Sequence, residues 1–292
     1  MMEVRDSARA VKVVIHRGLL AGLLACSAAQ AQEQAGAEGP GTGAEIGEFA
    51  VRADVWFASL SGDADFGGGG TTTLNVDDDL GLDDGEASFL GEIDWRKDRW
   101  LVFVNLFDTN AEADTRLSTP ITLNGTVVGA GTDVHSEFGA TNLAAYVGYD
   151  LFENLLSESE RTDLRLHAFV GGRGLNIDHS VLPSGGSLAE YDEWSAALEG
   201  GVRLSVVTDA GEPGGTMWDV GLTVTGGFPI AGDGDLSTVG VDFTINWFLN
   251  PNVGLTFGYH QLDFSVDDDS AASAYEFDGR LAGLMLGAQI KF

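Results

Sequence analysis

The last stretch of the chain, Leu281–Phe292, reads LAGLMLGAQIKF. Counted back from Phe292, every second residue is apolar or small, and these residues are Ile290, Ala288, Leu286, Leu284 and Ala282. The positions between them include Lys291, Gln289 and Gly287. A period of two places alternate side chains on opposite faces of an extended chain. The stretch therefore predicts a β-strand with one apolar face and one polar or small face.

This strand resembles the C-terminal signature strand of Gram-negative outer-membrane β-barrels, because its apolar positions are in phase with a terminal aromatic residue. The resemblance implies that the barrel-assembly machinery reads an assembly signal formed by Phe292, Ile290, Ala288, Leu286 and Leu284. A strand of a soluble β-sandwich can show the same alternation. The rest of the chain must decide between the two.

Length and composition limit the fold. The chain has 292 residues, of which 44% are hydrophobic and 41 are glycine, so it is too apolar to be disordered as a whole. No run of about eighteen apolar residues suits a membrane-spanning helix. Every backbone N–H and C=O in lipid needs a partner, so this chain can cross a membrane only as a closed barrel.

The first 31 residues carry features of an export signal. Arg5, Arg9, Lys12 and Arg17 precede a short apolar run, and Ala29-Gln30-Ala31 offers small residues for cleavage after position 31. We therefore expect a signal peptide over residues 1–31. Cys26, which follows Leu23-Leu24-Ala25, leaves lipidation as the alternative.

Residues 32–47 are mostly Gly, Ala and Glu, and we expect a flexible periplasmic leader there, before a barrel over residues 48–292. Cys26 is the only cysteine, so its removal would exclude thiol catalysis and cysteine-bound metals. The formal net charge of −30 argues against nucleic acid as a partner. It would also repel the phosphates of lipopolysaccharide unless divalent cations bridge them.

Alternation with a period of two recurs along the chain and predicts the fold class. Ten segments show it, with apolar residues in one phase and charged or polar ones in the other: 49–57, 88–95, 100–106, 143–151, 164–173, 194–206, 218–225, 239–247, 253–260 and 281–292. Strands of this length cross a tilted bilayer. Short connections alternate with long ones, and we expect longer external loops over residues 61–85, 109–133, 178–189 and 267–274. We predict an all-β, transmembrane, antiparallel up-and-down barrel of about ten strands, with eight or twelve as alternatives.

Two long stretches carry the family resemblance. They read NVDDDLGLDDGEASFLGEIDWRKDRWLVFVNLFD (75–108) and MWDVGLTVTGGFPIAGDGDLSTVGVDFTINWFLNPNVGLTFGYHQLDF (217–264). Together with the terminal strand they resemble a broad group of proteobacterial outer-membrane barrel proteins, loosely similar to OmpA and OmpW. The resemblance implies a location in the cell outer membrane, with membrane lipid and lipopolysaccharide as neighbours. It implies no activity, since most members of that group have none established.

The polar faces of these strands predict a charged lumen. The residues expected to form this lumen charge network are Arg52, Asp54, Glu92, Asp94, Asp150, Arg165, Arg173, Glu199, Arg203, Asp219, Asp242 and Lys291. One interpretation is a packed network in which each charge is paired with a neighbour. The other is a polar lining that admits small solutes. We favour the packed or narrowly gated lumen.

Acidic clusters in the predicted external loops are weak candidates for metal binding. Asp77, Asp79, Asp83 and Asp84 supply oxygen ligands of the kind that Ca²⁺ and Mg²⁺ prefer, but their spacing matches no known calcium loop. Solvated loop charge is the preferred interpretation. We expect no cofactor.

Two short acidic motifs contain residue types that hydrolytic enzymes use. Asp63-Ala64-Asp65 and Asp133-Val134-His135 supply the residue types of an omptin-like aspartate/histidine protease, although the surrounding omptin sequence is absent. A lipid hydrolase would need a converging Ser, His and acid, and no such motif is visible, so we predict no catalytic residue. The function we predict is that of a structural or surface-exposed outer-membrane barrel, with a narrow solute pore, an enzyme and a soluble periplasmic β-protein as alternatives. The sequence does not indicate an oligomeric state.

Overall fold

The computed structural model describes residues 47–67, 72–82, 87–157, 162–209, 217–230, 235–268 and 274–292. The predicted signal peptide and the body of the predicted leader lie outside these residues, as do Asp83 and Asp84. Among the residues described, no helix is long and apolar enough to span a membrane.

Ten long antiparallel strands form one sheet. Their bounds are β1 Glu48–Phe66, β3 Ala87–Lys97, β4 Trp100–Arg116, β7 Asp133–Ser157, β8 Thr162–Pro183, β9 Ala189–Asp209, β10 Met217–Pro229, β11 Asp235–Asn250, β12 Val253–Asp268 and β13 Tyr275–Lys291. Three short strands complete the described structure: β2 Leu74–Asn75, β5 Ile121–Leu123 and β6 Thr126–Val128.

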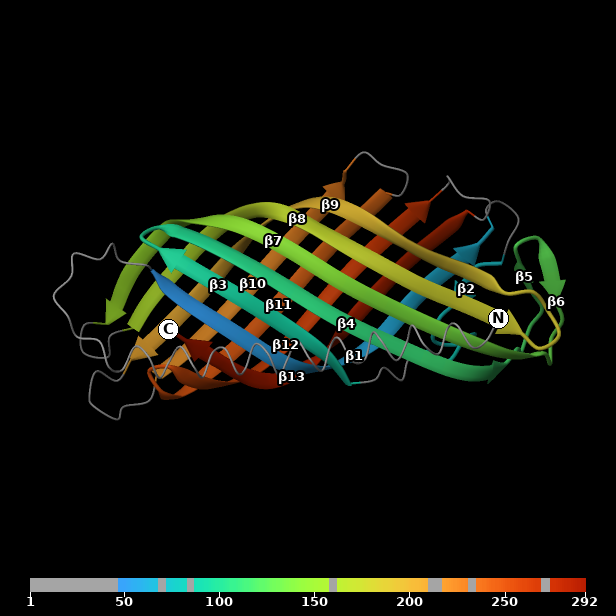
Figure 1. Ribbon diagram of the computed structural model, residues 1–292, viewed down its shortest axis with the longest axis horizontal. Coiled ribbons are helices and arrows are strands. Elements are labelled where there is room, and N and C mark those ends of the chain that lie inside the picture. The colour runs from blue at the N-terminus through green and yellow to red at the C-terminus, as the bar shows by residue number, and fades with distance from the viewer. Residues whose placement is uncertain are drawn as a thin grey trace. The chain divides into compact units, whose positions relative to one another are not determined.

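The sheet closes on itself. Each long strand pairs with the next in sequence, and β13 pairs with β1 from Ala50–Lys291 to Phe66–Tyr275. The strands run obliquely around the unit, so that β3, β4, β7 and β8 cover the strands behind them (Figure 1). The prediction of an antiparallel up-and-down β-barrel of about ten strands is confirmed, and each of the ten predicted segments lies in its own strand, except that Phe292 follows the end of β13.

Turn chemistry differs at the two ends of the barrel. At one end, β3 and β4 join through Asp98-Arg99, with Asp98 at a φ of 55°. At the other end, β5 and β6 form a hairpin whose turn residues Asn124 and Gly125 have φ values of 48° and 73°. Positive φ at both central residues is the signature of a type I′ turn, for which Asn-Gly is the favoured sequence.

The outer wall has an apolar belt at the end that carries the β3–β4 turn. Val55, Leu286 and Phe257 are neighbours on β1, β13 and β12, point outward and are each about half exposed. Along β7 the belt covers Leu143–Leu151, about 20–25 Å at ordinary strand rise and barrel tilt. We call the part of the barrel within this belt the belt half, and the part beyond it the outer half.

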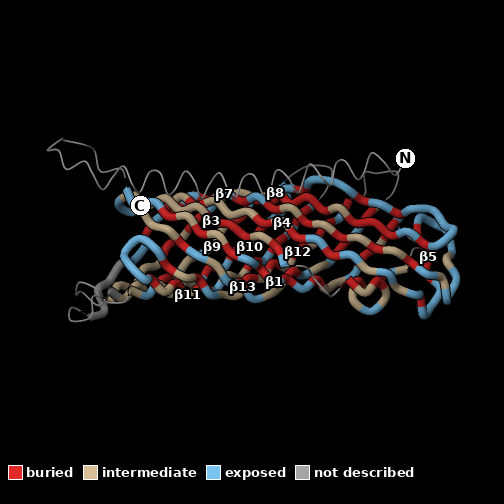
Figure 2. Tube along the Cα trace, turned by 60° about the horizontal axis from the view of Figure 1, so that its bottom comes forward, coloured by how far each residue is buried: buried red, intermediate tan, exposed pale blue. Residues whose placement is uncertain are grey.

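The strands continue far beyond the belt. β1 runs to Phe66, β4 to Arg116 and β8 to Pro183, so segments that the sequence predicted as external loops are wall. In this outer half the polarity of the two faces is reversed: apolar side chains point inward and polar ones point outward. On β1, Leu60, Ala64 and Phe66 point inward and are buried, whereas Asp63 and Asp65 lie on the outer face. Buried and exposed positions alternate along the strands of both halves (Figure 2).

An apolar core fills the outer half. Ten of its fully buried members are Leu60, Phe66, Leu74, Val76, Leu80, Leu82, Leu175, Leu236, Leu262 and Phe277. A protein interior packed in this way holds few voids larger than a water molecule.

The segment 72–82 fills the position between β1 and β4 that β3 does not reach. β3 pairs with β1 only as far as Phe57, whereas β1 and β4 both continue beyond it. There the Val76 N–H donates to the Gly62 carbonyl (3.0 Å), and the Thr115 hydroxyl donates to the Leu80 carbonyl (3.0 Å). The segment thus bridges β1 and β4 and turns its leucines inward.

The β5–β6 hairpin lies against the same end of the barrel (Figure 1). Asn124 N–H donates to the Phe66 carbonyl (3.2 Å), and Ile121 and Leu123 are buried in the apolar core. The β5–β6 hairpin therefore covers the end of the outer half, and its buried side chains add to the apolar core.

Candidate functional site

The lumen of the belt half holds a network of charged side chains. Arg52 Nε lies 2.9 Å from Asp54, and its Nη2 lies 3.7 Å from Glu92 and 3.6 Å from Asp242. Arg203 reaches the same network from β9, at 3.1 Å from Glu92 and 2.9 Å from Asp94. Its guanidinium also lies over the ring of Phe103, 4.1 Å from the centroid. Two arginines thus share four carboxylates contributed by strands β1, β3 and β11.

A second cluster is centred on Arg173 and Glu199. The two side chains pair through two bonds, and Arg173 Nη1 also donates to Asn142 Oδ1 (2.6 Å). Tyr146 and Thr238 donate their hydroxyls to the same carboxylate. Both charged residues are buried, so each has its partners within the lumen.

The remaining predicted lumen residues lie toward the turn end. His167 Nε2 is 2.5 Å from Asp150 and 3.0 Å from Arg96 Nη2. Arg165 lies 3.8 Å from Asp163, and Lys291 lies 3.5 Å from Asp219. Each of the twelve predicted network residues is on an inward-facing strand position, and the ion pairs described above group them into several clusters.

A cavity of about 30 Å³ lies at the centre of the network, lined among others by Arg52, Phe103, Arg203 and His260. That volume suits roughly two water molecules. Beyond it, Trp56 is fully buried, with ring centroids 5.2 Å from Phe107 and 5.0 Å from His260. In the described part of the chain, side chains fill both the charged and the apolar sections of the lumen.

Of the predicted assembly-signal residues, Leu284, Leu286, Ala288 and Ile290 lie on the outer face of β13, where Leu284 and Leu286 are among the most exposed apolar side chains of the belt; Phe292 follows the end of this strand. Of the weak metal candidates, Asp79 accepts the Asn75 N–H at 3.0 Å, and Asn75 in turn accepts the N–H groups of Asp77 and Asp78. These contacts shape the 72–82 turn.

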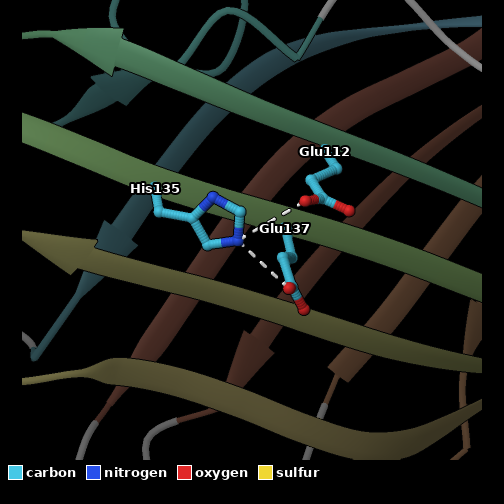
Figure 3. A group of neighbouring side chains, drawn as sticks. All are labelled: Glu112, His135 and Glu137. Atoms are coloured by element: carbon cyan, nitrogen blue, oxygen red, sulfur yellow. Dashed lines mark hydrogen bonds and ion pairs between the residues drawn. The ribbon is translucent and has the colours of Figure 1, made fainter. Parts of the chain in front are cut away.

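The outer wall holds a different cluster, formed by β4 and β7. Glu112 and Glu137 are direct cross-strand partners, and so are Asp114 and His135. His135 Nε2 lies 3.2 Å from Glu137 Oε1 and 3.8 Å from Glu112 Oε1. Its Nδ1 lies 2.9 Å from Asp114. The imidazole points between the two glutamates (Figure 3).

The His135 side chain is partly open to solvent, and its pKa is raised by the neighbouring carboxylates. The His135 side chain is 34% exposed, and an open depression beside it is lined by Pro183–Gly186 of the β8–β9 connection. The hydrogen bond to Asp114 raises the pKa of His135 above its ordinary value, because the neighbouring carboxylate favours the charged imidazole.

The structure separates the residues of the protease hypothesis. Asp63 and Asp65 are on β1, and β3 and β4 lie between β1 and β7 in the sheet. Asp65 accepts a hydrogen bond from Thr73, and Asp133 lies 3.9 Å from Arg116. His135 instead meets Glu112, Asp114 and Glu137. The sequence pattern predicts residues 109–133, which include Glu112 and Asp114, as a loop, so it does not place them opposite His135 and Glu137. The pattern that could have found them is Glu-x-Asp on one strand and His-x-Glu on the next, each with the spacing of residues on one face of a strand.

Comparison with known proteins adds little to this picture. No protein-family model matches the chain, and no match is found among curated proteins.

Several solved structures share its general outline. The outer membrane protease OmpT from Escherichia coli is 9% identical, with 87% of this chain and 99% of that chain covered and a TM-score of 0.41. Neisserial surface protein A is 16% identical, with 84% and 99% covered and a TM-score of 0.32. Ail from Yersinia pestis is 11% identical, with the same coverages and a TM-score of 0.33. With TM-scores below 0.5, these likenesses support no conclusion about what this chain does.

Proposed function

We propose that this chain is an integral outer-membrane β-barrel with a closed lumen, whose role is structural or surface-exposed. The observation that carries the proposal is the division of the wall. In the belt half, apolar side chains such as Val55, Phe257 and Leu286 face outward while charged ones face the lumen. A soluble barrel would leave this belt in water, whereas lipid would cover it.

The orientation follows from the same division. The belt lies near the short β3–β4 turn, and the long polar extension with the β5–β6 hairpin projects from the other side. In barrels of this kind short turns face the periplasm and long connections face outward. The outer half would then extend beyond the lipopolysaccharide headgroups and present an acidic wall, with Asp63, Asp114, Asp133 and Asp278 on its surface.

Partners follow from this placement. Hydrocarbon chains would contact the belt, and the assembly machinery would read the β13 signal during biogenesis. The acidic wall would meet lipopolysaccharide phosphates only with divalent cations between them, since like charges repel.

A solute pore is the less favoured function. A cavity of about 30 Å³ lies among the ion pairs of the belt half, and the apolar core of the outer half lies across the path beyond it. Conduction would require both sections to rearrange, and paired buried charges are costly to separate.

Two measurements test the proposal. The protein, expressed with its leader in a Gram-negative host, should fractionate with the outer membrane and show heat-dependent mobility on a gel. Recovery in the soluble periplasmic fraction would refute the membrane assignment. Folded protein inserted in a planar bilayer should give no discrete conductance steps, and reproducible steps would show instead that the lumen is open.

A further inference from the structure

Two carboxylates face each other directly on the wall of the outer half. Glu112 of β4 and Glu137 of β7 are register partners in an antiparallel pair. Like charges at directly opposed positions destabilise a sheet. The imidazole of His135, on β7, lies beside both carboxylates, with Nε2 3.2 Å from Glu137 and 3.8 Å from Glu112.

His135 is held in a specific orientation beside this pair. Its Nδ1 is hydrogen-bonded to Asp114, and its Nε2 is directed at one oxygen of each glutamate. A histidine whose one ring nitrogen is fixed by a carboxylate presents the other as a metal ligand, which is the usual arrangement around protein-bound metals.

The ligand atoms have suitable spacing. Nε2 and the two glutamate oxygens all lie within 4.8 Å of one another. Tetrahedral ligands at the ordinary zinc bond lengths of about 2.0–2.1 Å are separated by about 3.3 Å. The Nε2–Glu137 distance of 3.2 Å already meets this value, and the Nε2–Glu112 distance of 3.8 Å needs only a small side-chain movement.

We propose that Glu112, His135 and Glu137 form a binding site for a divalent transition-metal ion, with Asp114 as the residue that orients the imidazole. The mixed nitrogen and oxygen donors favour zinc and its neighbours over Ca²⁺ or Mg²⁺, which prefer oxygen ligands alone. Three protein ligands leave a fourth position open to water or an external group. The ion would neutralise the opposed glutamates and join β4 to β7.

A proton is the competing occupant, since a charged imidazole would also satisfy the carboxylates. Metal titration of the full folded chain separates the two. Zinc chloride is titrated by calorimetry into detergent-solubilised protein that shows heat-dependent mobility, with millimolar Mg²⁺ present to occupy loose acidic sites. We expect saturable zinc binding that includes one site per barrel dependent on His135.

Variants assign that site. His135→Ala should abolish it, and Glu112→Gln should weaken it at least tenfold. Asp114→Asn keeps all three ligands and should weaken it by about 10–100-fold, the usual effect of losing an orienting partner. Asp133→Asn is the matched control, because it removes the same charge from the same strand pair, and it should leave zinc affinity unchanged.

Cobalt gives a second readout that does not depend on affinity. Co²⁺ in a tetrahedral site with a histidine ligand should give a visible absorption band in wild-type protein that is absent in His135→Ala. Zinc binding that is absent, that His135→Ala leaves intact, or that Asp133→Asn lowers as much as Glu112→Gln would overturn the proposal. These results are independent of lumen conductance, so the site and the closed lumen can fail separately.

Discussion

Arg173 of β8 and Glu199 of β9 are joined inside the barrel by two hydrogen bonds, Nε to Oε1 at 2.6 Å and Nη2 to Oε2 at 3.2 Å. Both residues are less than 5% exposed. Asn142 and Tyr146 of β7 and Thr238 of β11 complete their hydrogen bonding. A paired charge of this kind is tolerated within a barrel only because every partner is supplied.

Breaking this pair on one side should be strongly destabilising. Arg173→Met leaves Glu199 buried without its cation, and we expect the free energy of unfolding to fall by about 3–5 kcal/mol. Urea unfolding followed by tryptophan fluorescence measures the change. Arg280→Met is the control, because Arg280 pairs with Asp263 at 2.5 Å on the exposed wall, where solvent screens the pair, and this variant should lose clearly less stability than Arg173→Met. Equal losses in the two variants would show that the lumen pair is solvated.

A charged side chain on the outer face of the belt should destabilise the barrel in lipid. Leu286→Arg, on the outer face of β13, is expected to destabilise the barrel in lipid by about 2–4 kcal/mol, the cost of a basic side chain near the bilayer midplane. Ser237→Arg, on the exposed outer face of β11 beyond the belt, should change stability by less than about 0.5 kcal/mol. Refolding into vesicles at a series of urea concentrations measures both. If both variants behave alike, the belt does not face lipid.

Trp56 should contribute strongly to stability, because it packs between the charged section and the apolar section of the lumen. It is fully buried against Phe107 and His260, so Trp56→Ala removes a large side chain and leaves a cavity. We expect a loss of about 3–5 kcal/mol in the free energy of unfolding. Phe57→Ala, at the next position but on the outer face, should cost clearly less in detergent. If Trp56→Ala lowers the free energy of unfolding by no more than Phe57→Ala does, the side chain of Trp56 is not tightly packed in the lumen.

His179 should make the outer half sensitive to acid. It is buried among Phe66, Phe138 and Tyr275, and burial lowers the pKa of His179 to about 3. The unfolded chain binds a proton at this residue below about pH 6.5, whereas the folded protein does so only near pH 3. The free energy of unfolding therefore falls as the pH decreases through that window, by up to about 1.4 kcal/mol per unit.

His179→Phe removes this titration, so its stability should depend less on pH than that of the wild type between pH 6.5 and pH 4. Tyr275→Phe is the control, because it removes the hydrogen bond to the His179 ring (3.0 Å) but keeps the imidazole. Urea midpoints at several pH values measure all three proteins. Parallel curves for wild type and His179→Phe would contradict the assignment.

The sequence by itself determined the barrel. In the belt half, the two faces of each strand meet lipid and a charged lumen, so residues such as Val55 and Asp54 alternate with a period that can be read along one strand. The strand count, the antiparallel order and the inward phase of Arg52, Glu92, Arg173 and Glu199 follow from that local pattern. None of these depends on knowing which strands are far apart in space.

Only the tertiary structure shows how the outer half is built and which side chains meet across the strands. Beyond the belt the wall faces water and the interior is apolar, so polar residues point outward and apolar residues point inward. The sequence pattern therefore predicts residues 61–66 and 109–116 as loop, because their outward-facing side chains are not those of a lipid-facing strand. The pairing of Arg203 with Asp94 and the meeting of Glu112 with His135 join residues from different strands. Their register and the closure of the sheet set these contacts, and neither property is written in the period of a single strand.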